Sequence, residues 1–137
     1  MQPTAVNDRT LTELDHVRLT NLIHRTPEAT PPKALEDLLD NADLVPVREA
    51  SPDLVTMYSQ VEIADPANGE RQKITLCYPT DADPTKGFIS VLSPVGVALL
   101  GQRVGAVARW TLPNGVQAAA EVVAILFQPE ATGDFTT

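Results

Sequence analysis

The segment from Ile89 to Gly105 constrains the fold more than any other part of the chain. Residues around Val91 favour a strand, and Ser93 followed by Pro94 is typical of a helix N-cap and first helical position. Because the helical residues that follow are apolar, we expect this short helix to pack against another element. Gly101 stands where such a helix ends.

The same segment resembles the outline of a phosphate-binding P-loop, with Gly96 and Gly101 separated by four residues after a strand. A P-loop requires Lys and then Ser or Thr after its second glycine. Here Gln102 and Arg103 follow, and Pro94 places Gly96 inside a helical turn. The glycines are therefore interpreted as residues for turns and close packing.

Length and composition favour a single compact protein. The 137 residues match one ordinary domain, or a small domain with an appendage, and 43% of them are hydrophobic. No apolar run approaches the length of a membrane span, and the N-terminus lacks the features of a signal peptide. The single cysteine, Cys77, fits a reducing compartment. We therefore expect a cytoplasmic protein without membrane contact.

The net charge of the chain indicates which class of partner it binds. A formal net charge of -8 disfavours direct nucleic-acid binding, which depends on neutralising phosphates with Lys and Arg. An acidic protein can still act on transcription through a protein partner with a basic surface. The sequence thus favours a protein partner over DNA.

Hydrophobic periodicity divides the chain near Ser51–Pro52. Residues 1–50 are predicted to form two amphipathic helices in a short antiparallel hairpin, the first capped by Thr10 with Glu13 and ending near Arg25. The second is expected to begin near Pro31 or Pro32, with Thr30 as its cap. Because so few residues do not make a stable isolated pair of helices, we expect one end of the hairpin to pack against the β-strand region.

Residues 51–137 have strand patterns separated by turn signals such as Pro113-Asn114-Gly115. The fold class is therefore predicted as α+β, a helical hairpin followed by an antiparallel sheet with one short helix. The expected strands cover 55–64 with a break near residue 59, 71–78, 88–92, 106–112 and 116–127.

No residue pattern indicates a reaction centre. Acidic residues on the second helix share a face, which is more typical of a solvated helix surface than of a magnesium site. His16 and His24 are not spaced as a metal pair on adjacent turns. We therefore expect no metal, no cofactor and no enzymatic activity. The acidic residues are Glu36, Asp37, Asp40 and Asp43.

Four segments closely resemble the GreA/GreB transcription elongation factor family, especially members with a short hairpin. They are Val55-Thr56-Met57, the run from Ser93 to Gly105, Trp110 to Gly115, and Gln128 to Asp134. The resemblance covers essentially the whole chain and is more specific in its C-terminal half.

The resemblance implies a coiled-coil hairpin followed by an FKBP-like domain. Members of the family dock on RNA polymerase beside its secondary channel, and the loop that begins the short helix contributes to docking. Those positions here are Ser93, Pro94, Val95 and Gly96. DNA binding attaches to the family only, and the scattered aromatic residues do not favour the prolyl isomerase activity that an FKBP-like fold suggests.

Transcript cleavage by the family depends on two carboxylates at the hairpin tip, three residues apart. The tip here, Arg25, Thr26, Pro27 and Glu28, offers Glu28 alone, and the hairpin is much shorter. A single carboxylate supplies too few of the oxygen ligands that a divalent metal ion requires. These departures predict a factor without cleavage activity.

Three hypotheses follow. The first is a non-enzymatic regulator that binds RNA polymerase at the secondary channel and competes with Gre factors. The second is a true cleavage factor acting through Glu28 and another acid such as Asp37. The third, to which the resemblance alone points, is a direct partner or regulator of nucleoside diphosphate kinase.

Overall fold

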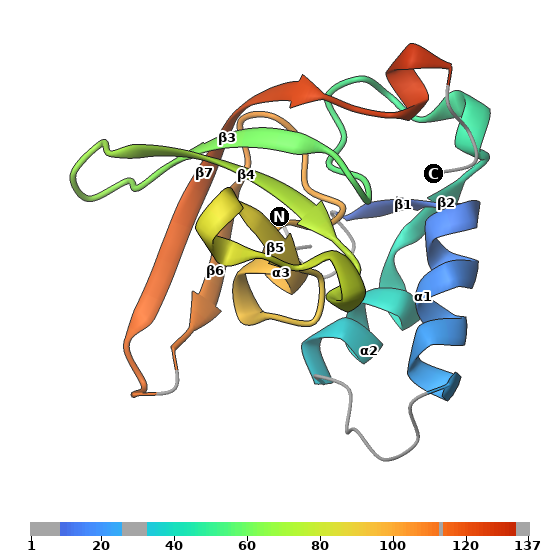
Figure 1. The fold of residues 1–137 in the computed structure, drawn as a ribbon, viewed down its shortest axis with the longest axis horizontal. Coiled ribbons are helices and arrows are strands. Elements are labelled where there is room, and N and C mark those ends of the chain that lie inside the picture. The colour runs from blue at the N-terminus through green and yellow to red at the C-terminus, as the bar shows by residue number, and fades with distance from the viewer. Residues whose placement is uncertain (1–8, 26–32, 113, 134–137) are drawn as a thin grey trace, which may run out of the picture.

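The protein is described here by a computed structural model, which covers residues 9–25, 33–112 and 114–133. A curled five-stranded sheet forms one side of the molecule, and the two longer helices stand at the other (Figure 1). The strands lie in the order β5-β4-β3-β7-β6. They are β3 (Gln60–Ala64), β4 (Arg71–Cys77), β5 (Phe88–Ser90), β6 (Val107–Thr111) and β7 (Gln117–Phe127).

The mixed α+β character is confirmed, and the last four of these strands lie close to their predicted ranges. The sheet is not wholly antiparallel, because β5 pairs in parallel with β4. Between them the chain makes two 3-10 turns, η3 (Pro79–Asp81) and η4 (Pro84–Lys86), which bring Phe88 beside Thr75 in the second half of β4. Register shifts between β3 and β7 at Gln60/Val61 and Glu62/Ile63 are irregularities of the kind that bend a sheet.

The strand predicted for 55–64 is too long. Only Gln60–Ala64 forms β3, and the preceding residues follow an irregular path to Tyr58, whose φ of 66° is left-handed. The Tyr58 N–H donates to the Leu76 carbonyl at 2.6 Å, and the Leu76 N–H donates to the Ser59 carbonyl at 3.1 Å. These bonds turn the chain into β3 just where the sequence indicated a break.

The first helix also begins later than predicted. Residues Thr10–Thr12 form β1, which pairs in parallel with β2 (Asp43–Val45), and α1 covers Glu13–Arg25. Thr12 takes the capping role assigned to Thr10, because its Oγ1 accepts the Asp15 N–H at 3.0 Å. The strand pairing with β2, which the local pattern did not reveal, holds Thr10 out of the helix.

The second helix, α2 (Lys33–Asn41), is followed by β2 and the 3-10 turn η2 (Val47–Glu49). Leu19 of α1 and Leu35 of α2 are fully buried, in the same hydrophobic cluster as sheet residues such as Val61 and Val122. The helices therefore share the core of the sheet, beyond the end contact expected. The coiled-coil hairpin, the FKBP-like description and the boundary at residue 51 stay predictions.

The predicted hairpin tip lies largely outside the described residues. Arg25 is the last residue of α1, and Thr26, Pro27 and Glu28 belong to the segment that is not described. None of the described helices is long and apolar enough to cross a membrane.

Candidate functional site

The short helix predicted after the strand at 88–92 is present as α3 (Pro94–Leu99). It lies beside β5 and β6 on the inner side of the curled sheet (Figure 1). The Ser93 hydroxyl accepts the Gly96 N–H at 3.1 Å and donates to the Ser90 carbonyl at 2.7 Å. Ser93 is thus the N-cap and Pro94 the first helical residue, as predicted. Both bonds of this hydroxyl are internal, so Ser93 shapes the corner between β5 and α3.

Gly96 permits the closest approach in this corner. A Cβ atom at this position would lie 2.2 Å from the Ser90 carbonyl oxygen, well inside any tolerated contact. Gly96 is also buried, so its role is to let α3 sit directly on the backbone after β5. The interpretation of this glycine as a packing residue is supported.

Pro94 and Val95 carry the accessible part of the corner. Pro94 is exposed at the first turn, whereas Val95 is half-buried and packs against the hydrophobic core. We define Ser93, Pro94, Val95 and Gly96 as the α3 corner. The structure brings these four predicted site residues together, with one of them open to solvent.

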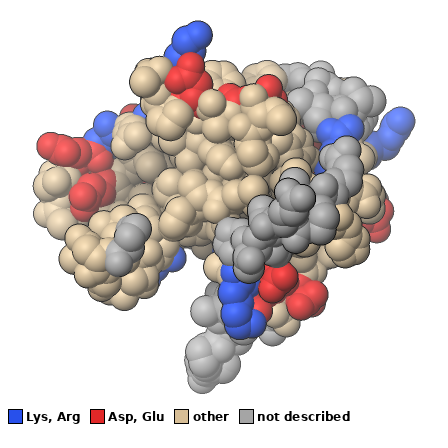
Figure 2. Space-filling view, turned by 60° about the horizontal axis from the view of Figure 1, so that its bottom comes forward, with Lys and Arg blue, Asp and Glu red and all other residues tan. Residues whose placement is uncertain are grey.

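Val95 also lies at the edge of a groove that the sequence did not reveal. The groove has a volume of about 850 Å³ and is lined by apolar side chains from several strands, with Arg71 and Arg109 among the charged residues around it. From one side, uncharged residues fill the middle of the molecular surface and charged side chains gather toward its edges (Figure 2). The apolar lining includes Ile63, Ile74, Ile89, Trp110, Ala118 and Ala120.

These apolar residues could not be placed together from sequence, because they come from five different strands. The curl of the sheet decides whether the face that they share is filled or open. Trp110, interpreted as core or rim packing, is at the rim of the core and lines the groove.

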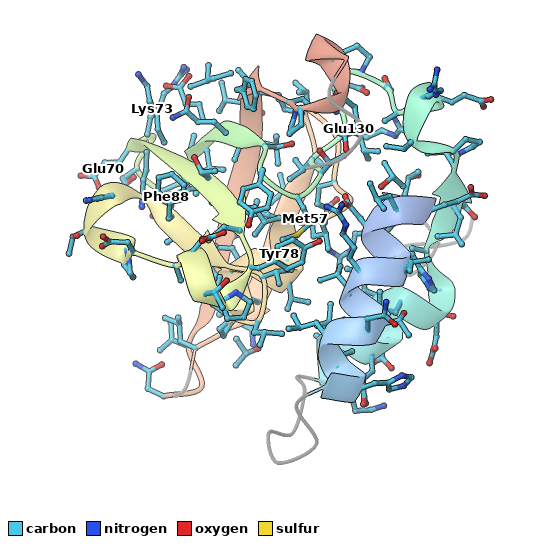
Figure 3. All side chains as sticks on the ribbon, turned by 45° about the vertical axis from the view of Figure 1, so that its right-hand side comes forward. Met57, Glu70, Lys73, Tyr78, Phe88 and Glu130 are labelled. Atoms are coloured by element: carbon cyan, nitrogen blue, oxygen red, sulfur yellow. The ribbon has the colours of Figure 1, made fainter. Side chains whose placement is uncertain are left out.

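A cluster of polar side chains joins α1 to the segment before β3. The Asp15 carboxylate, 1% exposed, accepts the Met57 N–H at 3.1 Å. Burial, with a smaller contribution from the nearby negative charge of Glu130, raises the pKa of Asp15 to about 6 against the lowering effect of the Met57 bond. Met57, Tyr78 and Glu130 lie on the side of the sheet that faces α1 (Figure 3).

The same cluster explains the motif Val55-Thr56-Met57. The Thr56 hydroxyl donates to Glu130 Oε1 at 2.8 Å, and the Thr56 N–H donates to the Ser59 hydroxyl at 2.9 Å. Glu130 belongs to the 3-10 turn η5 (Glu130–Thr132), so these bonds tie the C-terminal motif to the chain before β3. Both motifs therefore have structural roles.

The remaining titratable groups that the structure describes make contacts of a structural kind. Among the described residues, no three His, Cys, Asp or Glu side chains lie where they could hold a metal ion. His16 Nε2 lies 2.9 Å from the Leu39 carbonyl, and Asp37 pairs with Lys33 at 3.3 Å. Cys77 is buried, and burial raises the pKa of its thiol, which opposes the reactive thiolate form.

Comparison with known proteins agrees with this geometry. A family model described as transcription elongation factor, GreA/GreB, C-terminal, matches residues 49–127. This range contains the α3 corner and the strands that line the groove. The chain therefore belongs to the GreA/GreB family of transcription elongation factors.

Among its relatives, the regulator of nucleoside diphosphate kinase of Escherichia coli (strain K12) is 39% identical over 127 residues, which cover 91% of this chain and 93% of that protein. Transcription elongation factor GreA of Flavobacterium johnsoniae is 41% identical over 81 residues, but these cover 51% of that protein. The match to the regulator thus extends through the N-terminal helices, and that to GreA is confined to a shorter stretch.

Solved structures give the same placement. The prokaryotic transcription elongation factor GreA/GreB from Nitrosomonas europaea superimposes with a TM-score of 0.73 and 33% identity, covering 87% of this chain and 99% of that one. The GreA/GreB fold is therefore shared over nearly the full length of both.

Proposed function

We propose that this protein is a cytoplasmic regulator of transcription elongation that binds RNA polymerase through the α3 corner and the adjoining groove. Family membership supports polymerase as the partner class. The observation that supports the surface is the exposed Pro94 beside an apolar groove within the matched range. Apolar surface of this kind, rimmed by charged residues, is typical of protein interaction sites.

The docking proposal is tested with purified core RNA polymerase and the full chain. Pro94→Asp places a charge in the corner while keeping a residue type that suits a helix N-terminus. We expect it to weaken binding at least roughly tenfold, since a charge forced into an apolar contact is poorly compensated. Val17→Asp is the matched control, because Val17 is 53% exposed and belongs to α1, a different element from the corner. Equal binding by Pro94→Asp and the unmodified chain would remove the corner from the interface.

We further propose that the protein does not stimulate transcript cleavage and that it competes with Gre factors for the polymerase. Support comes from the sequence of the hairpin tip, where Glu28 is the one carboxylate. Backtracked complexes incubated with the protein should release no short 3′ fragments, and added protein should reduce the cleavage that a Gre factor produces. Fragment release by this protein alone would favour the alternative, a cleavage factor.

Direct regulation of nucleoside diphosphate kinase is a second candidate, supported by the 39% identity to the relative that bears that name. The described surface offers no separate feature for it. Binding assays with purified kinase and with core polymerase, run side by side, distinguish the two partners. Kinase binding that survives Pro94→Asp would establish a second interface.

A further inference from the structure

Arg9 lies far from the α3 corner in sequence but holds the other end of the same helix. Its guanidinium Nη1 donates to the carbonyls of Val97 at 2.7 Å, Ala98 at 3.1 Å and Leu100 at 2.8 Å. These carbonyls belong to the last turn of α3 and the residue after it, where a helix leaves acceptors without backbone donors. A cationic side chain there also opposes the negative end of the helix dipole.

The backbone around Arg9 reinforces this contact. The Thr10 N–H donates to the Gly101 carbonyl at 3.2 Å, and the Asp43 N–H donates to the Arg9 carbonyl at 3.0 Å. A Cβ atom on Gly101 would lie 3.0 Å from the Thr10 carbonyl oxygen, so the two segments are in close contact. The segment that leads into β1 and the end of α3 therefore form one packed unit.

The helix itself is short. Six residues at about 1.5 Å each give α3 a length of roughly 9 Å, so both ends influence its direction. Ser93 and the contact at Gly96 fix the start of α3, and Arg9 fixes its end. A shift at the end would tilt the first turn, where Pro94 and Val95 are presented.

We propose that Arg9 is a positioning residue for polymerase docking, acting through α3 to hold the α3 corner in its binding orientation. This inference rests on the proposed function and adds a regulatory consequence. The docking surface of the sheet depends on a residue from the N-terminal part of the chain, outside the region that the family model matches. Any change that displaces Arg9 would then weaken docking without touching the corner.

The test uses the full chain with Arg9→Gln, Arg9→Lys and the charge-matched control Lys33→Gln, whose side chain is exposed on α2. Hydrogen exchange reports the corner without any partner. We expect Arg9→Gln to raise exchange roughly tenfold at the amides of 97–102, since a hydrogen bond from a charged group is lost. Amides in β3 and β7 should be unchanged, and Arg9→Lys should lie between, because a single ammonium replaces a planar fork.

Polymerase affinity then tests the route through the corner. Arg9→Gln should weaken binding several-fold, and Pro94→Asp should cost less in the Arg9→Gln background than alone, because both act on the same surface. The proposal would be overturned if the fold-losses of affinity for the two single variants simply multiplied in the double variant. Hydrogen exchange that rises uniformly across the chain would overturn it as well. If the unmodified chain fails to bind polymerase, the proposed function is wrong, and the exchange measurement still decides whether Arg9 holds α3.

Discussion

The Asp15 carboxylate in α1 accepts a hydrogen bond from the Met57 N–H at 3.1 Å, although 42 residues separate them in the sequence. The bond joins the helical part of the chain to the segment before β3, at a position where Asp15 is 1% exposed. A buried carboxylate opposes its own ionisation, and Glu130 adds to that opposition. The contact thus joins the two parts of the molecule with a strength that depends on pH.

This relationship predicts how stability changes with pH. An unfolded aspartate titrates near pH 4, whereas folding raises the pKa of Asp15 to about 6. Between these values the folded state binds more protons, so the contribution of Asp15 is fully present below pH 4 and is lost as the pH rises through 6. Two pKa units correspond to roughly 3 kcal/mol.

Asp15→Asn should remove this dependence, because the amide keeps an oxygen that can accept from Met57. We expect the variant to be about 1–3 kcal/mol more stable than the unmodified chain at pH 7.5 and to lose that advantage toward pH 4. Urea unfolding of both proteins at both pH values measures the difference in their free energies of unfolding. The contributions of the other carboxylates cancel in that difference. A variant that is less stable at pH 7.5 would show that the ionised carboxylate is favourable where it lies.

The shared core predicts that the helices and the sheet unfold together. Leu19→Ala should lower the free energy of unfolding by about 2–5 kcal/mol, since Leu19 is fully buried in the cluster that includes the sheet. Val17→Ala, at a position 53% exposed, should change it by less than about 0.5 kcal/mol. Circular dichroism and Trp110 fluorescence should give coincident transitions. Two separated transitions would instead support independent domains.

Substitutions at Gly96 and Gly69 distinguish the cost of a steric clash from the cost of a left-handed backbone conformation. Gly96→Ala should destabilise the fold by at least about 3 kcal/mol, since its Cβ would lie 2.2 Å from a backbone oxygen. Gly69→Ala should cost only about 1–2 kcal/mol, because Gly69 has a φ of +75° but nothing within 4 Å of a Cβ. Denaturant midpoints for the two variants measure this contrast, and equal losses would contradict the packing assigned to α3.

The cap of α3 gives a smaller effect. Ser93→Ala removes the acceptor for the Gly96 N–H and should destabilise the protein by about 1 kcal/mol. Ser93→Asn should retain most of that stability, because asparagine is an equally good N-cap. Thermal unfolding of the two variants tests the order. Equal stability of Ser93→Ala and the unmodified chain would mean that Pro94 and the packing of α3 suffice to start the helix.

Local patterns predicted the elements whose signals lie within a few residues. The α3 corner, with its Ser-Pro start and buried Gly96, was visible because capping and helix initiation are short-range. The predictions failed where a distant partner intervened: pairing with Asp43 drew Thr10 into β1, and bonds to Leu76 kept residues 55–59 out of a strand. The groove was missed for the same reason.

By itself the sequence determined the mixed α+β class, the family resemblance and the corner that begins with Ser93, since each depends on residue identity and close spacing. The tertiary structure alone decided that Arg9 meets the end of α3, that Asp15 meets Met57 and that Trp110 borders an open groove. These contacts join residues from distant parts of the chain, and they exist because the helices and the curled sheet bury one common core.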